Sequence, residues 1–275
     1  MSVRWRWLGY AVASALAVGA GAAVLALAGS PVSTWVRNPI AWVVGALLAL
    51  AAARLHRPWH FAAVIGVGLA TLAATFAAAP VEGIHRWLDI GPLHINAAAL
   101  VLPPMLASLA RAERTWLQLV VVAVVGIILV LQPDASQATA FAAGAAVLLV
   151  LGRRSAAETL VGALICAAIA IAGWLRPDTL EPVAEVEGIF RLAAQVSVAL
   201  AAIGAAALAA ACLSPLLSRD SSRDAGAALA TYFAISALAP LSGAYPVPLV
   251  GLGMSFPVGW WLGVAVASTG RAEAR

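Results

Sequence analysis

Long apolar segments separated by short polar clusters follow one another along the whole chain. Each is long enough to cross the hydrocarbon core of a bilayer as a helix, and none shows the alternation of a membrane β-strand. The pattern therefore predicts an all-α, polytopic membrane bundle of about ten transmembrane helices. These helices are expected at about 8–29, 36–53, 61–79, 96–110, 116–132, 135–151, 157–175, 189–214, 225–241 and 247–268.

The composition supports the same class. Of the 275 residues, 63% are hydrophobic and 10% are charged, whereas a soluble domain has about 25% charged residues. The spans use most of the length, so we expect one transmembrane domain over residues 1–275. The sixteen basic residues are all arginines, placed singly or in pairs. Such scattered charges set topology and predict no nucleic-acid partner.

The arginines also predict the orientation. With the N-terminus inside and strict alternation, twelve arginines fall on the inner side and four on the outer side, which places both termini in the cytoplasm. The predicted outer arginines are Arg37, Arg86, Arg176 and Arg191. The predicted inner arginines are Arg4, Arg6, Arg54, Arg57, Arg111, Arg114, Arg153, Arg154, Arg219, Arg223, Arg271 and Arg275.

Three polar segments gather on the predicted outer side, at 81–96, 132–134 and 176–188. Isolated charges at membrane depth are costly unless they have partners or a function. Acids and bases that converge where a bundle opens to one side therefore predict a site for a charged, membrane-borne ligand.

Motifs in these segments resemble the SEDS family, the FtsW, RodA and SpoVE membrane proteins of bacterial division, elongation and sporulation. They are Gly83-Ile-His-Arg-Trp-Leu-Asp-Ile-Gly91, Gln132-Pro-Asp134, Pro240-Leu-Ser-Gly243 and Pro248-Leu-Val-Gly-Leu-Gly-Met-Ser255. They occur in the family's order, and ten spans with both termini inside also agree. The resemblance implies a location in the bacterial cytoplasmic membrane. It also implies polymerisation of lipid-linked disaccharide-pentapeptide into glycan strands, beside a transpeptidase of the class B penicillin-binding type.

The chain also departs from the family pattern. Family members carry a Glu and a Lys where this chain has Ala99 and Leu102. The large outer loop between spans 7 and 8, which carries the family's essential Asp, is reduced to 176–188. Glu187-Gly-Ile-Phe190 resembles the family's Asp-Phe-Ile-Phe stretch, so the resemblance places Glu187 at the position of that Asp. The late signature is looser as well, with one extra residue between Gly243 and Pro248.

Polymerising a lipid diphosphate donor requires a base for the acceptor hydroxyl and cations for the leaving diphosphate. Glu187 is the candidate base; alternatively, it favours the start of span 8 and pairs with Arg191 at i,i+4. Arg86 is the candidate anion ligand, beside Trp87. The alternative role for Arg86 is a hydrogen bond to the outer turn, or to Glu82 or Asp89, that holds the loop in place.

Asp134 heads span 6 and is expected as its N-cap, or as the partner of Arg86 or Arg191. The predicted substrate-binding residues are Arg86, Trp87, Asp134 and Arg191. Arg176-Pro-Asp178 is consistent with a simple end to span 7. His85 and His94 flank a turn, without metal-ligand spacing. We predict no metal and no cofactor.

Four functions remain open from the sequence. The first is an active SEDS-like peptidoglycan glycosyltransferase of division or shape maintenance, and the second is a degenerate paralogue that binds the precursor or a partner helix. The third is a transporter of lipid-linked precursor, although no inverted repeat is found and the charges lie near span ends. The fourth is a structural scaffold, which predicts that changes at Arg86 or Glu187 leave function intact.

Overall fold

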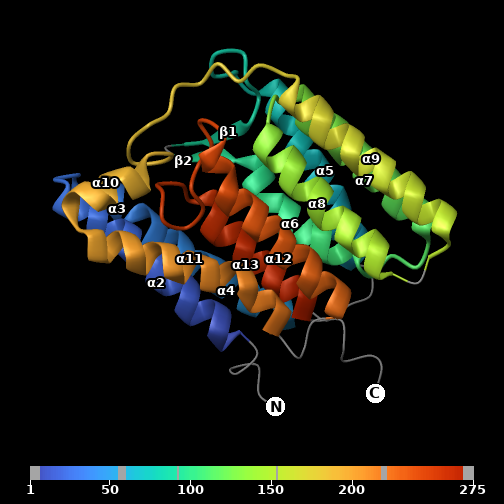
Figure 1. The fold of residues 1–275 in the computed structure, drawn as a ribbon, viewed down its shortest axis with the longest axis horizontal. Helices are drawn as coiled ribbons and strands as arrows, with labels where there is room; N and C mark the ends of the chain where they lie inside the picture. The colour runs from blue at the N-terminus through green and yellow to red at the C-terminus, as the bar shows by residue number, and fades with distance from the viewer. Residues whose placement is uncertain (1–6, 55–59, 92, 153, 218–221, 269–275) are drawn as a thin grey trace.

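The computed structural model describes residues 7–54, 60–91, 93–152, 154–217 and 222–268 (Figure 1). Seven of the predicted inner arginines lie outside these described residues: Arg4, Arg6, Arg57, Arg153, Arg219, Arg271 and Arg275.

Helices dominate the described residues, and the all-α polytopic prediction is confirmed. The α-helices are α2 (Leu8–Leu27), α3 (Val32–Trp35), α4 (Arg37–Arg54), α5 (His60–Ala74), α6 (Ala97–Leu109), α7 (Thr115–Leu131), α8 (Ala135–Leu151), α9 (Ala156–Trp174), α10 (Ile189–Val196), α11 (Val198–Leu217), α12 (Arg223–Leu238) and α13 (Ser255–Ser268). Two 3-10 helices, η1 (Thr75–Ala77) and η2 (Ala239–Leu241), extend α5 and α12. The antiparallel hairpin of β1 (Trp87–Ile90) and β2 (Leu93–Asn96) precedes α6.

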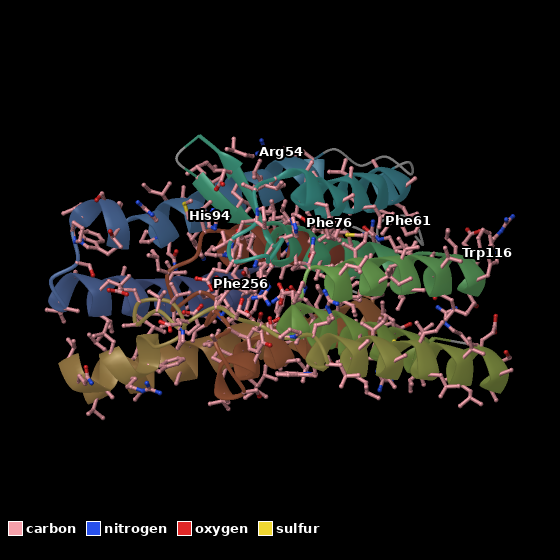
Figure 2. All side chains as sticks on the ribbon, turned by 90° about the horizontal axis from the view of Figure 1, so that it is seen from above. Arg54, Phe61, Phe76, His94, Trp116 and Phe256 are labelled. Atoms are coloured by element: carbon pink, nitrogen blue, oxygen red, sulfur yellow. The ribbon has the colours of Figure 1, made fainter. Side chains whose placement is uncertain are left out.

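Five helical stretches are long and apolar enough to cross a membrane, and five shorter apolar helices accompany them in the described part of the chain. The long ones are Leu8–Leu27, Val32–Arg54, Ala156–Trp174, Val198–Leu217 and Arg223–Leu241. Their outward residues include large apolar side chains such as Leu16, Leu47 and Leu164, each more than half exposed. Exposed leucines on every side are expected when the surrounding solvent is lipid. Trp116, at the start of α7, lies at the periphery of the bundle (Figure 2).

Helix α13 lies in the middle of the bundle and packs against α4 and α6 (Figure 1). Small residues bring these backbones close together. A Cβ atom on Gly259 would lie 2.1 Å from the Ala99 carbonyl oxygen of α6, and one on Gly45 would lie 2.9 Å from Val258 Cα. Other closely packed pairs include α2 with α11, and α8 with both α9 and α12.

Two predicted spans differ clearly from the helices of the structure: span 8 is broken in its interior, and span 10 begins later than predicted. Span 8 is broken at Ser197, whose extended backbone separates α10 from α11 and whose hydroxyl accepts a hydrogen bond from the Leu200 amide at 3.3 Å. Span 10 begins at Ser255, because residues 247–254 form turns in which Pro248, Gly251 and Gly253 follow in close succession. These turns are fixed by Asn38 of α4, whose amide group bonds the Leu249 and Gly251 carbonyls and the Gly253 amide.

The two described ends of the chain meet at one end of the bundle, where Trp7 Nε1 donates to Ser268 Oγ at 3.0 Å. The hairpin lies at the other end of α13, where the Asn96 amide donates to Ser255 Oγ at 2.9 Å. An even number of crossings places both chain ends on one side. Their cytoplasmic location stays a prediction.

Candidate functional site

Arg86 is the centre of a buried ion-pair cluster at the hairpin end of the bundle. It directly precedes β1, and its side chain is 3% exposed. Its Nη2 donates hydrogen bonds to Asp178 Oδ2, at 2.7 Å, and to the Pro133 carbonyl. Its Nε lies 3.6 Å from Asp134 Oδ2. Three segments that are distant in sequence therefore meet at one guanidinium group.

Asp134 is held rigidly by the start of α8. Its Oδ1 accepts hydrogen bonds from the Gln137 amide at 3.1 Å and the Ser136 hydroxyl at 2.9 Å. The predicted N-cap and the predicted pairing with Arg86 are both present, because the two carboxylate oxygens serve different partners. Arg191 is not a partner of Asp134 among the described ion pairs.

Asp178 reaches Arg86 from the connection between α9 and α10, which passes over the hairpin end of the bundle (Figure 1). Its Oδ1 accepts from the Leu180 amide at 3.2 Å, and Thr179 Oγ1 donates to the Glu82 carbonyl at 3.4 Å. The sequence interpretation of this stretch as a helix end is correct, since α9 ends at Trp174, but it missed the second role of Asp178. Neither Glu82 nor Asp89 pairs with Arg86 in the described part of the chain, where Asp89 instead lies 2.6 Å from His94. The bond of Arg86 to the Pro133 carbonyl fits the other form of that alternative, a hydrogen bond to an outer turn.

Tyr245 forms one wall of the cluster. The guanidinium carbon of Arg86 lies 5.9 Å from the centre of its ring, within cation–π range. Its other contact is an edge-to-face arrangement with Trp174 at 5.6 Å between ring centres. Burial, together with the nearby Asp178 carboxylate, raises the pKa of Tyr245 to about 12. The phenol is therefore neutral near pH 7, when it can donate or accept a hydrogen bond but carries no charge.

The electrostatics of the cluster favour a permanently charged Arg86. Burial alone would lower its pKa, but the carboxylates of Asp134 and Asp178 outweigh that effect and raise it. One cation faces two carboxylates, so the three groups together carry a formal charge of −1 when all are ionised.

Glu187 lies in the field of the same cluster. Burial raises its pKa above the usual carboxyl range, and the negative charge of Asp178 acts in the same direction. Its Oε2 accepts from the Val183 amide at 2.7 Å. No ion pair joins Glu187 to Arg191 in the described part of the chain, so the expected pairing is absent, although Glu187 does lie just before the start of α10. A half-buried carboxyl with a raised pKa is suited to receive a proton.

The turn that carries Glu187 is docked on the loop before α13. The Leu252 amide donates to the Glu185 carbonyl at 2.8 Å, and the Val247 amide to the Val186 carbonyl at 3.4 Å. A Cβ atom on Gly251 would lie 2.3 Å from the Val186 oxygen. Gly251 therefore permits the backbone approach that holds Glu187 near the cluster.

The other two predicted residues lie around this centre. Trp87 stacks on His94, with 5.1 Å between ring centres, on the hairpin. Arg191 is exposed on α10 and lines a hollow of about 210 Å³ beside the 182–188 turn. Their predicted roles in substrate binding stay predictions.

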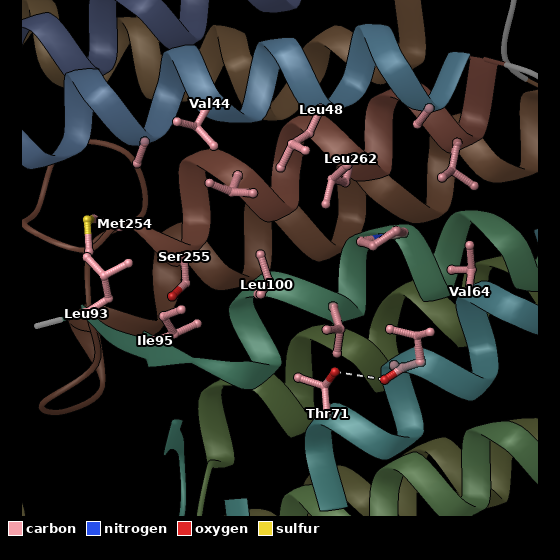
Figure 3. A pocket seen from close by; sticks show the side chains of 18 of the residues that line it. Val44, Leu48, Val64, Thr71, Leu93, Ile95, Leu100, Met254, Ser255 and Leu262 are labelled. Atoms are coloured by element: carbon pink, nitrogen blue, oxygen red, sulfur yellow. Dashed lines mark hydrogen bonds between the residues drawn. The ribbon is translucent and has the colours of Figure 1, made fainter. Parts of the chain in front are cut away.

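An apolar cavity of about 650 Å³ lies on the other side of the hairpin (Figure 3). It is bounded by α4, α5, α6 and α13, with Leu93 and Ile95 of β2 and Met254 at its hairpin end. Because side chains alternate along a strand, the hairpin presents Leu93 and Ile95 to the cavity and His94 to the opposite face. No local sequence pattern marks this cavity, because four helices that are separated in sequence form it together and each contributes mainly apolar side chains.

Metal ligation finds no support among the described residues, where no group of three or more His, Cys, Asp or Glu side chains converges. Ala99 and Leu102, at the positions where the family has charges, are fully buried in α6, and the Ala99 carbonyl faces Gly259 of α13. These positions contribute helix packing here.

Comparison with solved structures identifies the architecture. A variant and the unmodified form of the rod shape determining protein RodA of Thermus thermophilus match with TM-scores of 0.65 and 0.59, at 22% and 20% identity. Each comparison covers 96% of this chain and at least 95% of the other. The chain has the RodA fold.

The same fold occurs in a chain from a peptidoglycan synthase complex that coordinates polymerization and crosslinking. That chain matches with a TM-score of 0.65 at 21% identity, over 94% of this chain and 96% of its own length. No family model matches the sequence, and no curated protein matches it. The RodA fold therefore extends over nearly the whole chain, in agreement with the resemblance found in the sequence motifs.

Proposed function

We propose that this chain is a SEDS-like cell-wall assembly protein of the bacterial cytoplasmic membrane that binds a lipid-linked peptidoglycan precursor at the Arg86 cluster. The observation that carries the proposal is the buried guanidinium of Arg86 at the predicted outer end of a RodA-like bundle. Arginine is the side chain best suited to bind a diphosphate, through several charge-assisted hydrogen bonds.

The apolar cavity supports a ligand that carries a long hydrocarbon chain. Its lining is almost entirely apolar, with Val44, Leu48 and Leu262 among others, and fits a polyprenyl chain (Figure 3). Its two hydroxyl groups are already engaged, Thr71 with the Val67 carbonyl and Ser255 with the Asn96 amide. Strand β2 of the hairpin lines this cavity, and Arg86 directly precedes strand β1 of the same hairpin. A lipid-linked diphosphate has the matching division between an apolar tail and an anionic head.

The proposed reaction is glycosyl transfer. The acceptor sugar hydroxyl attacks the anomeric carbon of the donor, the bond from that carbon to the diphosphate oxygen breaks, and the lipid diphosphate leaves. Glu187 takes the hydroxyl proton, and Arg86 stabilises the charge that develops on the leaving diphosphate. A positioned base of this kind contributes about 10²–10⁴-fold to a rate.

A second candidate is a paralogue that binds the precursor or a partner without catalysis. Two observations favour it. Ala99 and Leu102 replace the charged residues of the family with buried apolar packing, and Arg86 is already neutralised by two carboxylates. The membrane complex of the similar synthase chain suggests a class B penicillin-binding protein as the partner in either case.

A polymerisation assay separates the two candidates. Purified protein, alone and with a candidate penicillin-binding partner, is incubated with lipid-linked disaccharide-pentapeptide, and glycan strands are measured. For a polymerase, Glu187→Gln is expected to lower the rate by about 10²–10⁴-fold, while Glu181→Gln, in the exposed part of the same connection, leaves it unchanged. Absence of strands from folded wild-type protein, with a working positive control, supports the non-catalytic paralogue.

The pH profile tests Glu187 further. A base acts in its deprotonated form, so activity falls as pH drops through its pKa. Because burial raises that pKa, the rate is expected to begin to fall at a pH above the ordinary glutamate pKa of about 4.3. A limb at the ordinary value would argue against Glu187 as the base.

A further inference from the structure

The two carboxylates that neutralise Arg86 are held in different ways. Asp134 is 2% exposed and fixed by its cap bonds to α8, whereas Asp178 is 15% exposed and lies in a connection without regular structure. Asp178 is therefore the outermost charged group of the cluster. A ligand that approaches Arg86 from outside the bundle meets Asp178 first.

The net negative charge of the cluster opposes the binding of an additional anion. With Asp178 engaged, the formal charge is −1, and the Nη2 group of Arg86 is occupied by Asp178 and by the Pro133 carbonyl. If Asp178 leaves, an anion of the ligand can take its position on Nη2. Asp134 remains 3.6 Å from Nε, a buried donor that has no hydrogen-bond partner in the described structure.

We propose that Asp178 is a displaceable counter-ion that closes the Arg86 site and is replaced by a phosphate group of the ligand. This inference rests on the proposed function, because it takes the ligand to be a lipid-linked diphosphate. The exchange replaces one anion with another at the guanidinium, so a small anion gains little by it. A ligand whose hydrocarbon tail also occupies the apolar cavity gains the burial of that tail, and the ion pair thus selects amphiphilic diphosphates over free ones.

The connection is built so that only its first half needs to move. Residues 183–188 are docked on the loop before α13 by the Glu185 and Val186 carbonyls. Residues 176–182 are tied inward by the Asp178 ion pair and by the hydrogen bond of Thr179 to Glu82 at 3.4 Å. Displacement of Asp178 therefore leaves Glu187 in place.

Binding of geranylgeranyl diphosphate and of inorganic pyrophosphate to the purified full chain in detergent tests the inference. Tryptophan fluorescence is a suitable readout, because Trp174 contacts Tyr245 beside Arg86. Asp178→Asn is expected to bind the prenyl diphosphate about tenfold more tightly than wild type, since a charge-assisted bond no longer opposes the ligand. Glu181→Gln, which removes the same charge from the same connection, is expected to change affinity less than about twofold.

The outcomes separate this inference from the proposed function. Equal affinity of wild type and Asp178→Asn, with binding lost in a folded Arg86→Gln variant, would overturn the counter-ion role alone. Binding that does not depend on Arg86, or no binding to any folded variant, would overturn both. Equally tight binding of inorganic pyrophosphate would contradict the predicted selection for an apolar tail.

A crosslink provides a second test that does not alter Arg86 or Asp178. The paired substitutions Glu82→Cys and Thr179→Cys join the two segments that are hydrogen bonded at 3.4 Å. The oxidised protein is expected to bind the prenyl diphosphate at least about tenfold more weakly, with recovery after reduction. The native thiols, Cys166 and Cys212, are buried, and the Glu82→Cys single variant controls for oxidation. Unchanged affinity of the crosslinked protein would contradict the proposal.

Discussion

The start of α8 and the connection between α9 and α10 both supply a carboxylate to Arg86, but they are built on different principles. At the start of α8, Asp134 satisfies backbone and side-chain donors of its own helix while it faces the guanidinium. In the connection, Asp178 is supported by one backbone amide. A charge fixed by a helix terminus serves as part of the scaffold, whereas a charge on an irregular segment can exchange with a ligand.

The largest expected loss of stability follows from replacing Asp134, the counter-ion that is fixed by the start of α8. Asp134→Ala removes the α8 cap and one of the two counter-ions of a buried arginine, so it is expected to destabilise the protein by about 3–5 kcal/mol. Asp134→Asn keeps an acceptor for the cap and should cost less. Unfolding by sodium dodecyl sulfate in mixed micelles measures both variants. A loss below about 1 kcal/mol for the alanine variant would show that Asp134 is not part of the scaffold.

The docked half of the connection should show the next largest effect. Gly251→Ala places a Cβ atom 2.3 Å from the Val186 carbonyl oxygen, so one of the two backbones must shift. Overpacking of this kind costs about 1–3 kcal/mol, and it should also displace the turn that carries Glu187. Gly253→Ala is a matched control, because a Cβ atom there meets nothing within 4 Å. Equal unfolding midpoints for the two variants would contradict the docking of this turn.

The sequence predicted the scaffold side of the site better than the connection. Asp134 could be identified as an N-cap because capping is local, with its donor only three residues away at Gln137. Arg86 was recognised from its motif. Asp178 and Tyr245 were not recognised as members of the site, because their contacts with Arg86 span 92 and 159 positions of sequence, and no local pattern encodes such a pairing.

The same difference between local and long-range contacts explains which helix bounds were predicted correctly. Span 6 was predicted at 135–151 and α8 has these bounds, because Asp134 and Gly152 mark its ends. The break at Ser197 was not predicted, since apolar residues continue on both sides of it and hydropathy does not register a bend. The start of span 10 was placed too early for a related reason. The turns at 247–254 are apolar and are stabilised by Asn38, which lies more than 200 positions away.

The smallest expected effect on stability is at Asp178, although its expected effect on binding is large. Asp178→Asn removes a partly exposed charge while Asp134 continues to neutralise Arg86, so the free energy of unfolding should change by less than about 1 kcal/mol. Unfolding both Asp178→Asn and Asp134→Asn in mixed micelles compares the two counter-ions directly, because each variant makes the same chemical change. If both asparagine variants lose equal stability, the two carboxylates are equally structural and Asp178 is not free to exchange. A small loss at Asp178 together with tighter diphosphate binding would show that the two regions divide support and ligand exchange between them.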